Sequence, residues 1–258
     1  MHYPAPHRLI TLIPLLVAGL IAPYIAQAQV HIGAHTMLKV GQGDGVSPAV
    51  TPPIATQHRG SSMIVFNGGD TRNLATPTDT YSNTWTPLGD PVVYNGYPGS
   101  SVMGYVSLAA TGGPNHVISI AKHAYPADEI TVPFVEIENA GILQDFAQNY
   151  PASGTTITSG SVTTTGPATL VALWWGDAGV KVMTAVPGNG FSIIESFLHL
   201  PDNSGVQCAV AVKQVTGPGT YSVTWTDNPS QGAILWLLAF QSRGGGTLSD
   251  PIFANGFD

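Results

Sequence analysis

A pair of carboxylates is the first feature of this sequence that could do chemistry. Glu136 and Glu138 stand two residues apart in the run "PFVEIEN". On a strand they share one face about 6.5–7 Å apart, which approaches the carboxylate separation of inverting glycosidases. Two acids on one strand, however, point the same way instead of flanking a bond. The alternatives are an exposed acidic face, or one Glu that anchors a turn by accepting hydrogen bonds from backbone N–H groups.

Two metal sites are conceivable from the residue types. Asp79 and Asn83 could bind calcium through oxygen, but such residues more often organise a turn through side-chain to backbone hydrogen bonds. Cleavage of the chain after Ala28 would make His31 its third residue. A free amine, two backbone amides and that imidazole suit the square-planar nitrogen set of Cu(II). Cyclisation of Gln29 would block the amine. We expect no obligatory cofactor, with calcium as the alternative.

Aromatic residues offer a ligand platform. Sandwich proteins that bind sugars place aromatic rings on an exposed face or loop. Tyr94 and Tyr97 lie in the Gly- and Asn-rich loop "VVYNGYPGS", and Trp174 and Trp175 are adjacent on a strand, so that they face opposite sides. We take Tyr94, Tyr97 and Trp175 as the candidate platform. The alternative is that these side chains pack in the core.

Other chemistries lack a signal. Cys208 is the only cysteine, so no internal disulfide can form, and its alternation with valines in "VQCAVAVKQV" predicts a small core residue. The sequence has no G-x-S-x-G and no H-E-x-x-H motif. The formal net charge is −7 and no basic run exists, which argues against nucleic acid as a partner.

The first 28 residues predict a secretory signal peptide. They combine Arg8, the apolar run "LITLIPLLVAGLIA" and Ala26-Gln27-Ala28, an A-x-A cleavage signal. The apolar run is too short to span a bilayer, so we expect no transmembrane segment after cleavage. We predict a secreted protein, with the periplasm or the cell surface as alternatives.

The rest of the chain predicts one all-β domain. Short β-type runs alternate with turn clusters such as "YNGYPGS" and "TGGPN". We predict an antiparallel, jelly-roll-like β-sandwich of about eleven strands over residues 56–242, after an irregular lead-in at 29–55. Residues 141–150 are the one plausible helix. The heptads "TYSNTWT" at 80–86 and "TYSVTWT" at 220–226 each predict a strand. The core should include Cys208, Val210, Val223, Trp225, Ile234 and Leu237.

The order of motifs resembles a widespread bacterial family of secreted β-sandwich domains without an established activity. The chain supplies "DTYSNTW" from Asp79, "GGPNHVISI" from Gly112, "ENAG" from Glu138, "SGSVTTT" from Ser159, and the final strand "AILWLLAF". The resemblance covers nearly the whole domain and implies a sandwich. One departure stands out: Ser82 occupies a position where the family usually has Gly.

Residues 243–258 predict a Gly-rich linker and a tail. The ending "PIFANGFD" resembles C-terminal I-F-x-x-G-F-[ED] segments of bacterial secreted proteins, which implies a sorting or processing signal carried by Ile252, Phe253, Gly256 and Phe257. Together these features favour a secreted, non-catalytic module that binds or adheres to polysaccharide or another envelope component. The alternatives are a glycan-acting hydrolase and a purely structural exported domain.

Overall fold

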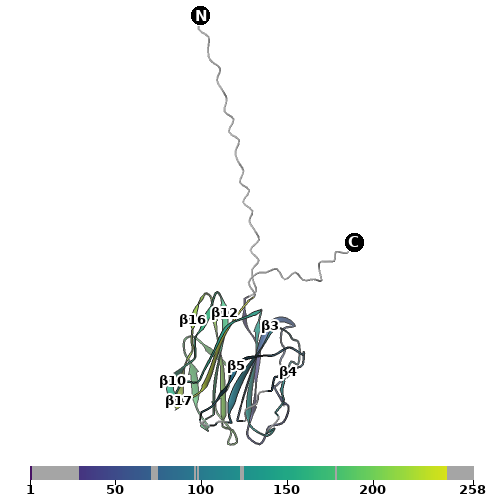
Figure 1. Ribbon diagram of the computed structural model, residues 1–258, viewed down its shortest axis with the longest axis vertical. Helices are drawn as coiled ribbons and strands as arrows, with labels where there is room; N and C mark the ends of the chain where they lie inside the picture. The colour runs from purple at the N-terminus through teal and green to yellow at the C-terminus, as the bar shows by residue number, and fades with distance from the viewer. Residues whose placement is uncertain are drawn as a thin grey trace, which may run out of the picture.

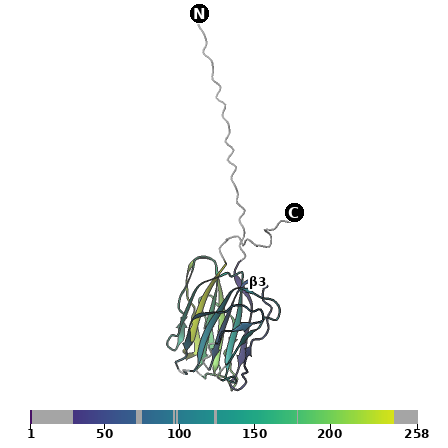
Figure 2. The ribbon, with the colours of Figure 1, turned by 45° about the vertical axis from the view of Figure 1, so that its right-hand side comes forward.

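A computed structural model describes residue 1 and residues 29–242, except 71–74, 96, 98, 123–124 and 178. The predicted signal peptide and the predicted sorting tail, with Ile252, Phe253, Gly256 and Phe257, lie outside the described residues. In the described part the chain is all-β (Figures 1 and 2), which confirms the predicted fold class. No described helix is long and apolar enough to cross a membrane.

Ten strands form two five-stranded antiparallel sheets. We call them sheet 1 and sheet 2. Sheet 1 has the order β1-β8-β3-β6-β5, with bounds His31–Val40, Ile130–Glu138, Arg59–Gly69, Ser101–Thr111 and Thr86–Val93. Sheet 2 has the order β14-β15-β12-β18-β9, with bounds Ser192–Phe197, Val206–Val215, Ala168–Asp177, Ile234–Gln241 and Ile142–Asn149.

Eight further strands, most of them short, lie outside these two sheets. One group is β2-β7-β4, at Ala49–Val50, Ile118–Ile120 and Thr78–Asp79. The others are β10-β17-β13, at Gly154–Thr158, Thr224–Gln231 and Thr184–Pro187, and the pair β11-β16, at Val162–Thr164 and Gly219–Tyr221. These strands bring the total among the described residues to eighteen instead of about eleven.

The core between the two large sheets follows the strand alternation. On β12, Val171, Leu173 and Trp175 point into it, and the intervening residues point to the opposite face of sheet 2. Trp175 also bridges the two sheets, because its indole N–H donates to Thr131 Oγ1 of β8 at 2.9 Å. Burying a large apolar side chain contributes about 1.5–3 kcal/mol, so this layer supplies much of the folding free energy.

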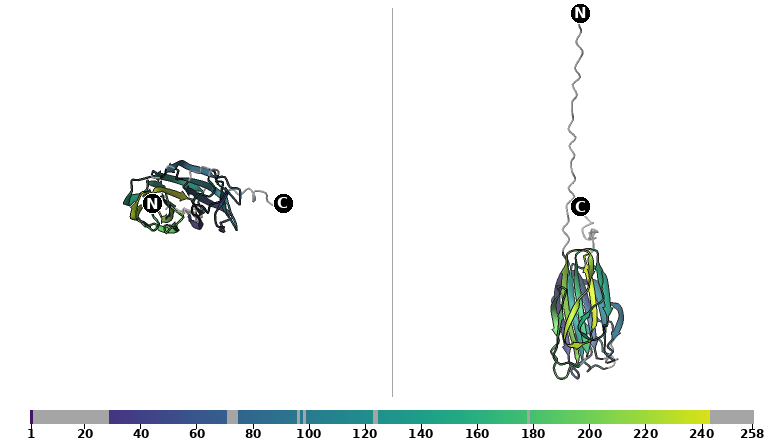
Figure 3. Two further views of the ribbon diagram at one scale, coloured as in Figure 1. Left: turned by 90° about the horizontal axis from the view of Figure 1, so that it is seen from below. Right: turned by 90° about the vertical axis from the view of Figure 1, so that its left-hand side faces the viewer.

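The outer faces of both sheets are also covered. On β12, Leu170, Ala172 and Trp174 pack beneath β10-β17-β13 and β11-β16, whereas Met63 and Val65 of β3 pack in the outer cluster of sheet 1 that holds Ile118 and Ile120 of β7. The layers lie side by side in Figure 1, with β10, β17 and β12 to the left of β3 and β4, and the left view of Figure 3 shows the sandwich from one end. This covering explains why "AILWLLAF" is apolar on both faces: all eight residues of β18 are buried. The six predicted core residues are buried as well.

Two segments differ from the sequence prediction because they are edge strands. Residues 31–40, predicted to be irregular, form β1, so the sandwich begins well before residue 56. Residues 142–149, predicted to be helical, form β9 beside β18. An edge strand is half exposed and needs no continuous apolar run. The apolar residues of β9 are therefore spaced as on one face of a helix. They are Ile142, Leu143, Phe146 and Ala147.

The two heptads also fold differently. The first forms no strand before Thr86, and the second is split between β16 and β17 at residues 222–223. In the first heptad, the Asp79 carboxylate binds the backbone N–H groups of Tyr81 and Asn83, which turns the chain away from a ladder. Ser82 within this turn has a φ of +57°, a left-handed conformation that favours glycine.

Candidate functional site

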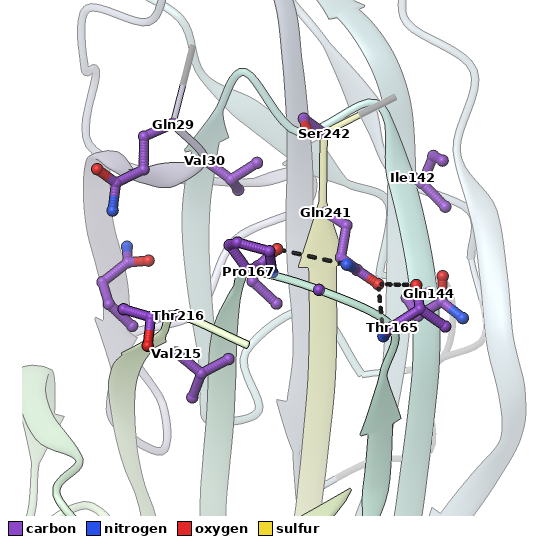
Figure 4. Close-up of a pocket in the computed structure, with 13 residues that line it drawn as sticks. Gln29, Val30, Ile142, Gln144, Thr165, Pro167, Val215, Thr216, Gln241 and Ser242 are labelled. Atoms are coloured by element: carbon purple, nitrogen blue, oxygen red, sulfur yellow. Dashed lines mark hydrogen bonds between the residues drawn. The ribbon is translucent and has the colours of Figure 1, made fainter. Parts of the chain in front are cut away.

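A cavity of about 490 Å³ lies at one end of the sandwich, where four neighbouring strands of sheet 2 terminate. Because β15, β12, β18 and β9 alternate in direction, the last residues of two strands meet the first residues of the other two. Val215 and Gln241 end their strands here, and Ala168 and Ile142 begin theirs. Val30, just before β1, closes the cavity from sheet 1 (Figure 4).

The lining combines neutral polar groups with apolar surface. None of the described residues that line the cavity has an ionisable side chain. Its polar members are Gln29, Gln144, Thr165, Gln214, Thr216, Gln241 and Ser242. The remaining members are Val30, Ile142, Gly166, Pro167, Ala168 and Val215.

Gln241 fixes the loop that forms one wall. Its Oε1 accepts hydrogen bonds from the Thr165 backbone N–H at 3.3 Å and from the Thr165 hydroxyl at 3.2 Å. Its Nε2 donates to the Pro167 carbonyl at 3.4 Å (Figure 4). The loop between β11 and β12 is therefore held by a side chain from β18, and the wall is built before any ligand arrives.

Other polar groups of the lining retain free hydrogen-bonding capacity. Gln214 Oε1 accepts from the Thr169 hydroxyl at 3.1 Å, and no described residue accepts from its amide N–H groups. Gln144 and Thr216 are exposed. Amides and hydroxyls can each donate and accept, but none of them is an acid, a base or an activated nucleophile. These groups can form hydrogen bonds with a polar ligand.

The predicted aromatic platform lies at the opposite end and is mostly buried. The Tyr94 hydroxyl donates to the Gly232 carbonyl at 3.0 Å, just before β18 begins. The Tyr94 ring stacks on Tyr97 and Tyr150, with centroid distances of 6.5 and 5.1 Å, and meets Trp175 edge-on at 6.1 Å.

The side chains of the predicted platform differ in their exposure to solvent. Tyr94 and Trp175 are 5% and 1% exposed, so the prediction that they form an exposed platform is wrong. Burial, with a further contribution from Tyr150, raises the pKa of Tyr94 far above its usual value. Of the three residues of the predicted platform, only Tyr97 is exposed, at 49%. The three rings lie in one region, but those of Tyr94 and Trp175 are buried in the core.

Two buried carboxylates occupy the same end as Tyr94. Asp177 accepts a short hydrogen bond from the Ser100 hydroxyl, which also lies 3.2 Å from Asp70 Oδ1. Burial is the main cause that raises the pKa of Asp177 to about 6, and the negative charges of Asp70 and Glu129 add to it. Glu129 Oε2 accepts from three groups of the segment 204–206, two of them at 2.7 Å. Both acids thus connect loops and are buried.

Glu136 and Glu138 do not form a catalytic pair. Glu136 is 1% exposed, and its carboxylate accepts from Gln57 N at 2.7 Å, Ser61 Oγ at 2.6 Å and Ala34 N at 3.2 Å. This confirms the alternative in which one Glu anchors backbone N–H groups. Glu138 instead lies 3.0 Å from His31 Nε2.

Asp79 and Asn83 organise a turn. Asp79 Oδ1 accepts from Tyr81 N at 2.7 Å and from the Asn83 amide at 3.2 Å, and Oδ2 accepts from Trp85 Nε1 at 2.7 Å. Burial raises the pKa of Asp79, but these hydrogen bonds, together with His116, outweigh burial and lower it overall. Its oxygens already have donors, which argues against calcium here. Across residues 29–242, excluding the gaps, no three His, Cys, Asp or Glu side chains converge to hold a metal ion.

No motif in the sequence predicts the cavity. Its glutamines are ordinary in type and separated along the chain, and only the register of sheet 2 brings them together. The chain matches no protein-family model, no curated protein and no solved structure at a significant level.

Proposed function

We propose that this chain is an exported, non-catalytic binding module, and that it holds a polysaccharide or another envelope component in the cavity at the end of sheet 2. One observation carries the proposal. A cavity of about 490 Å³ is lined by amides, hydroxyls and apolar side chains. This volume falls within the range of small-molecule sites, about 300–1,000 Å³, and such sites pair apolar walls with a few placed polar groups.

Binding is favoured over hydrolysis by the distribution of acids. A glycosidase of the common type needs two carboxyl groups flanking the scissile bond. None of the described residues that line the cavity is an acid. Glu129, Glu136 and Asp177 are buried and bonded to their own chain. Export is supported by the sequence of residues 1–28, and the sandwich by the resemblance to secreted domains of bacteria.

A variant that fills the cavity tests this proposal. Thr216 is exposed and lines the cavity, so Thr216→Trp should occupy it without disturbing the core. Thr156→Trp on β10 is the matched control, because Thr156 is also exposed but lies outside the cavity. Affinity electrophoresis through gels containing polysaccharide should show retention of the wild type and the control. Equal retention of the Thr216→Trp variant would place the ligand elsewhere.

A further inference from the structure

We infer that a groove between β13 and β14 binds the C-terminal segment 250–258 of the same chain. We call it the side groove. It has a volume of about 460 Å³ and shares no lining residue with the end cavity, so the inference does not depend on the proposed function. Most of its lining is apolar, contributed by Met183, Ala185, Val186, Ile193, Phe197 and Leu198.

The side groove exists because two consecutive strands belong to different sheets. β13 pairs with β17 in the outer sheet, whereas β14 pairs with β15 in sheet 2. Each is the last strand of its sheet. A bridge between Val182 and His199 joins the two segments at one end, and the turn at residues 188–191 joins them at the other. Between these two points the layers leave room for a further segment of chain.

Apolar surface in the side groove faces solvent. Val186 and Ile193 line it and are 55% and 41% exposed, and Val182 at the bridge is 63% exposed. Met183 and Ala185, which are buried, lie beside them along the chain. Exposed apolar side chains gathered around a groove are typical of a binding site for an apolar partner.

The C-terminal segment carries the side chains that such a groove binds. The sequence "DPIFANGFD" places Phe253 and Phe257 four residues apart. In an extended chain these two rings lie on one face, about 13 Å apart. The part of β14 and its continuation that lines the side groove runs from Ile193 to Leu198, which is about 16 Å of strand. Both rings can therefore contact the groove at once.

The linker has the length that this binding needs. In sheet 2, β14 lies three strand spacings from β18, which is about 14 Å. Ile193 lies four residues along the strands from the level of Gln241, which is about 13 Å. The separation of the two residues is thus about 19 Å, and a Gly-rich linker of the length from Gln241 to Phe253 spans about 17–21 Å. Such a match gives the tethered segment an effective concentration in the millimolar range.

Lys39 gives the bound segment a direction. Its ammonium lies 5.9 Å from the centroid of the Phe197 ring. Among the described residues no carboxylate forms an ion pair with it. The linker reaches the Ile193 end of the groove first, so Phe253 should lie there and Phe257 beside Phe197. Asp258 then lies next to Lys39, with opposite charge.

Paramagnetic relaxation in the isotopically labelled protein, with its C-terminal segment intact, tests the inference. A nitroxide attached to an Asn255→Cys variant reports where the segment lies, because Cys208 is buried and does not compete for the label. We expect the amide signals of Ile193 and Leu198 to lose at least half of their intensity. The signal of Ser119 on β7, in the outer layer of sheet 1, should be unchanged.

Variants of the groove and of the segment separate binding from chance encounters of the tethered label. Val186→Asp, which places a charge in the side groove, should at least double the remaining intensities of the groove signals. The double variant Phe253→Ser/Phe257→Ser should do the same. Val50→Asp is the matched control, because Val50 is also 41% exposed but lies on β2, outside the groove. It should leave the loss of intensity as in the labelled parent protein.

The outcomes that would overturn the inference are distinct. Full intensity of the groove signals in the labelled parent protein, or an equal loss in Val186→Asp, would show that the segment does not bind there. A loss that appears only when an unlabelled copy is mixed with a nitroxide-bearing copy would assign the groove to the segment of a second molecule. Lys39→Glu should reduce the loss, and Asp258→Lys in the same chain should restore it. Failure of this charge exchange would contradict the direction given to the segment.

Discussion

Asp227 on β17 faces Trp174 on β12, with one carboxylate oxygen 3.2 Å from the indole nitrogen and the other without a hydrogen-bond partner among the described residues. Asp227 is 1% exposed. It lies where the outer sheet β10-β17-β13 covers sheet 2. Its charge state should therefore affect the stability of the packing between these two layers.

This relationship predicts a stability that falls as pH rises. Burial raises the pKa of Asp227 to about 7, despite the opposing hydrogen bond from Trp174. In the unfolded chain its pKa is about 3.9. A raised folded pKa gives stability that is fully present below about pH 4 and is lost as the pH rises to about 7. The melting temperature should therefore decrease from pH 5 to pH 8.

The variant Asp227→Asn should reduce this pH dependence. It removes the buried charge while keeping the size of the side chain, and we expect it to raise the free energy of unfolding at pH 8 by about 1–3 kcal/mol relative to the wild type. Denaturant unfolding at pH 5 and pH 8 measures the difference. If the free energy of unfolding changed equally with pH in the wild type and the variant, Asp227 would not be the cause of the pH dependence.

Ser82 carries a conformational cost that glycine would remove. Its φ of +57° is unfavourable for a residue with a Cβ. Ser82→Gly should stabilise the protein by roughly 0.5–1 kcal/mol. Ser222 occupies the same place in the second heptad without a positive φ, so Ser222→Gly should be neutral or destabilising. Thermal denaturation of both variants makes the comparison, and a loss of stability in Ser82→Gly would show that the serine side chain is needed.

Neutralising Glu136 should lower the free energy of unfolding much more than neutralising Glu138. Glu136→Gln places an amide beside donors that now bind a buried carboxylate, so we expect a loss of about 2–3 kcal/mol. Glu138→Gln removes only a partly exposed contact with His31 and should cost about 0–1 kcal/mol. The free energies of unfolding provide the test. Equal losses would mean that the burial of Glu136 has no energetic consequence.

Substitutions of Tyr94 and Tyr97 by Ala should differ in their effect on the free energy of unfolding. Tyr94→Ala removes a buried ring and its hydrogen bond to Gly232, with an expected loss of about 3–5 kcal/mol. Tyr97→Ala should leave both stability and polysaccharide retention within error of the wild type. If Tyr97→Ala abolished retention while folding remained intact, the ligand would bind at the aromatic end and not in the cavity.

The sequence was sufficient for the fold class because alternation and turn residues repeat along the whole domain. The two-sided burial of β18 could be read directly from "AILWLLAF", and the core position of Cys208 from its valine neighbours. The edge strands β1 and β9 were missed, because half-exposed strands mix polar and apolar residues without a clear period. The outer strands β2, β4 and β13 were missed because two to four residues carry too little pattern.

The candidate site was harder to predict than the fold. In the sequence, Tyr94 and Trp175 fit a ligand platform, but large aromatic rings are also common in cores. Their positions along the chain do not distinguish the two. Asp79 could be read as a turn or a metal ligand until its four donors were visible. The cavity depends on the register of β15, β12, β18 and β9, which no local motif specifies.

The most direct measurement is an NMR titration of the isotopically labelled domain with a galactomannan oligosaccharide. If the cavity is the binding site, the amide signals of Gln144, Gln214, Thr216 and Gln241 should shift saturably, while those of Tyr97 and Tyr150 at the opposite end stay in place. Shifts confined to Tyr97, Tyr150 and their neighbours, or the absence of saturable shifts at any position, would contradict the account.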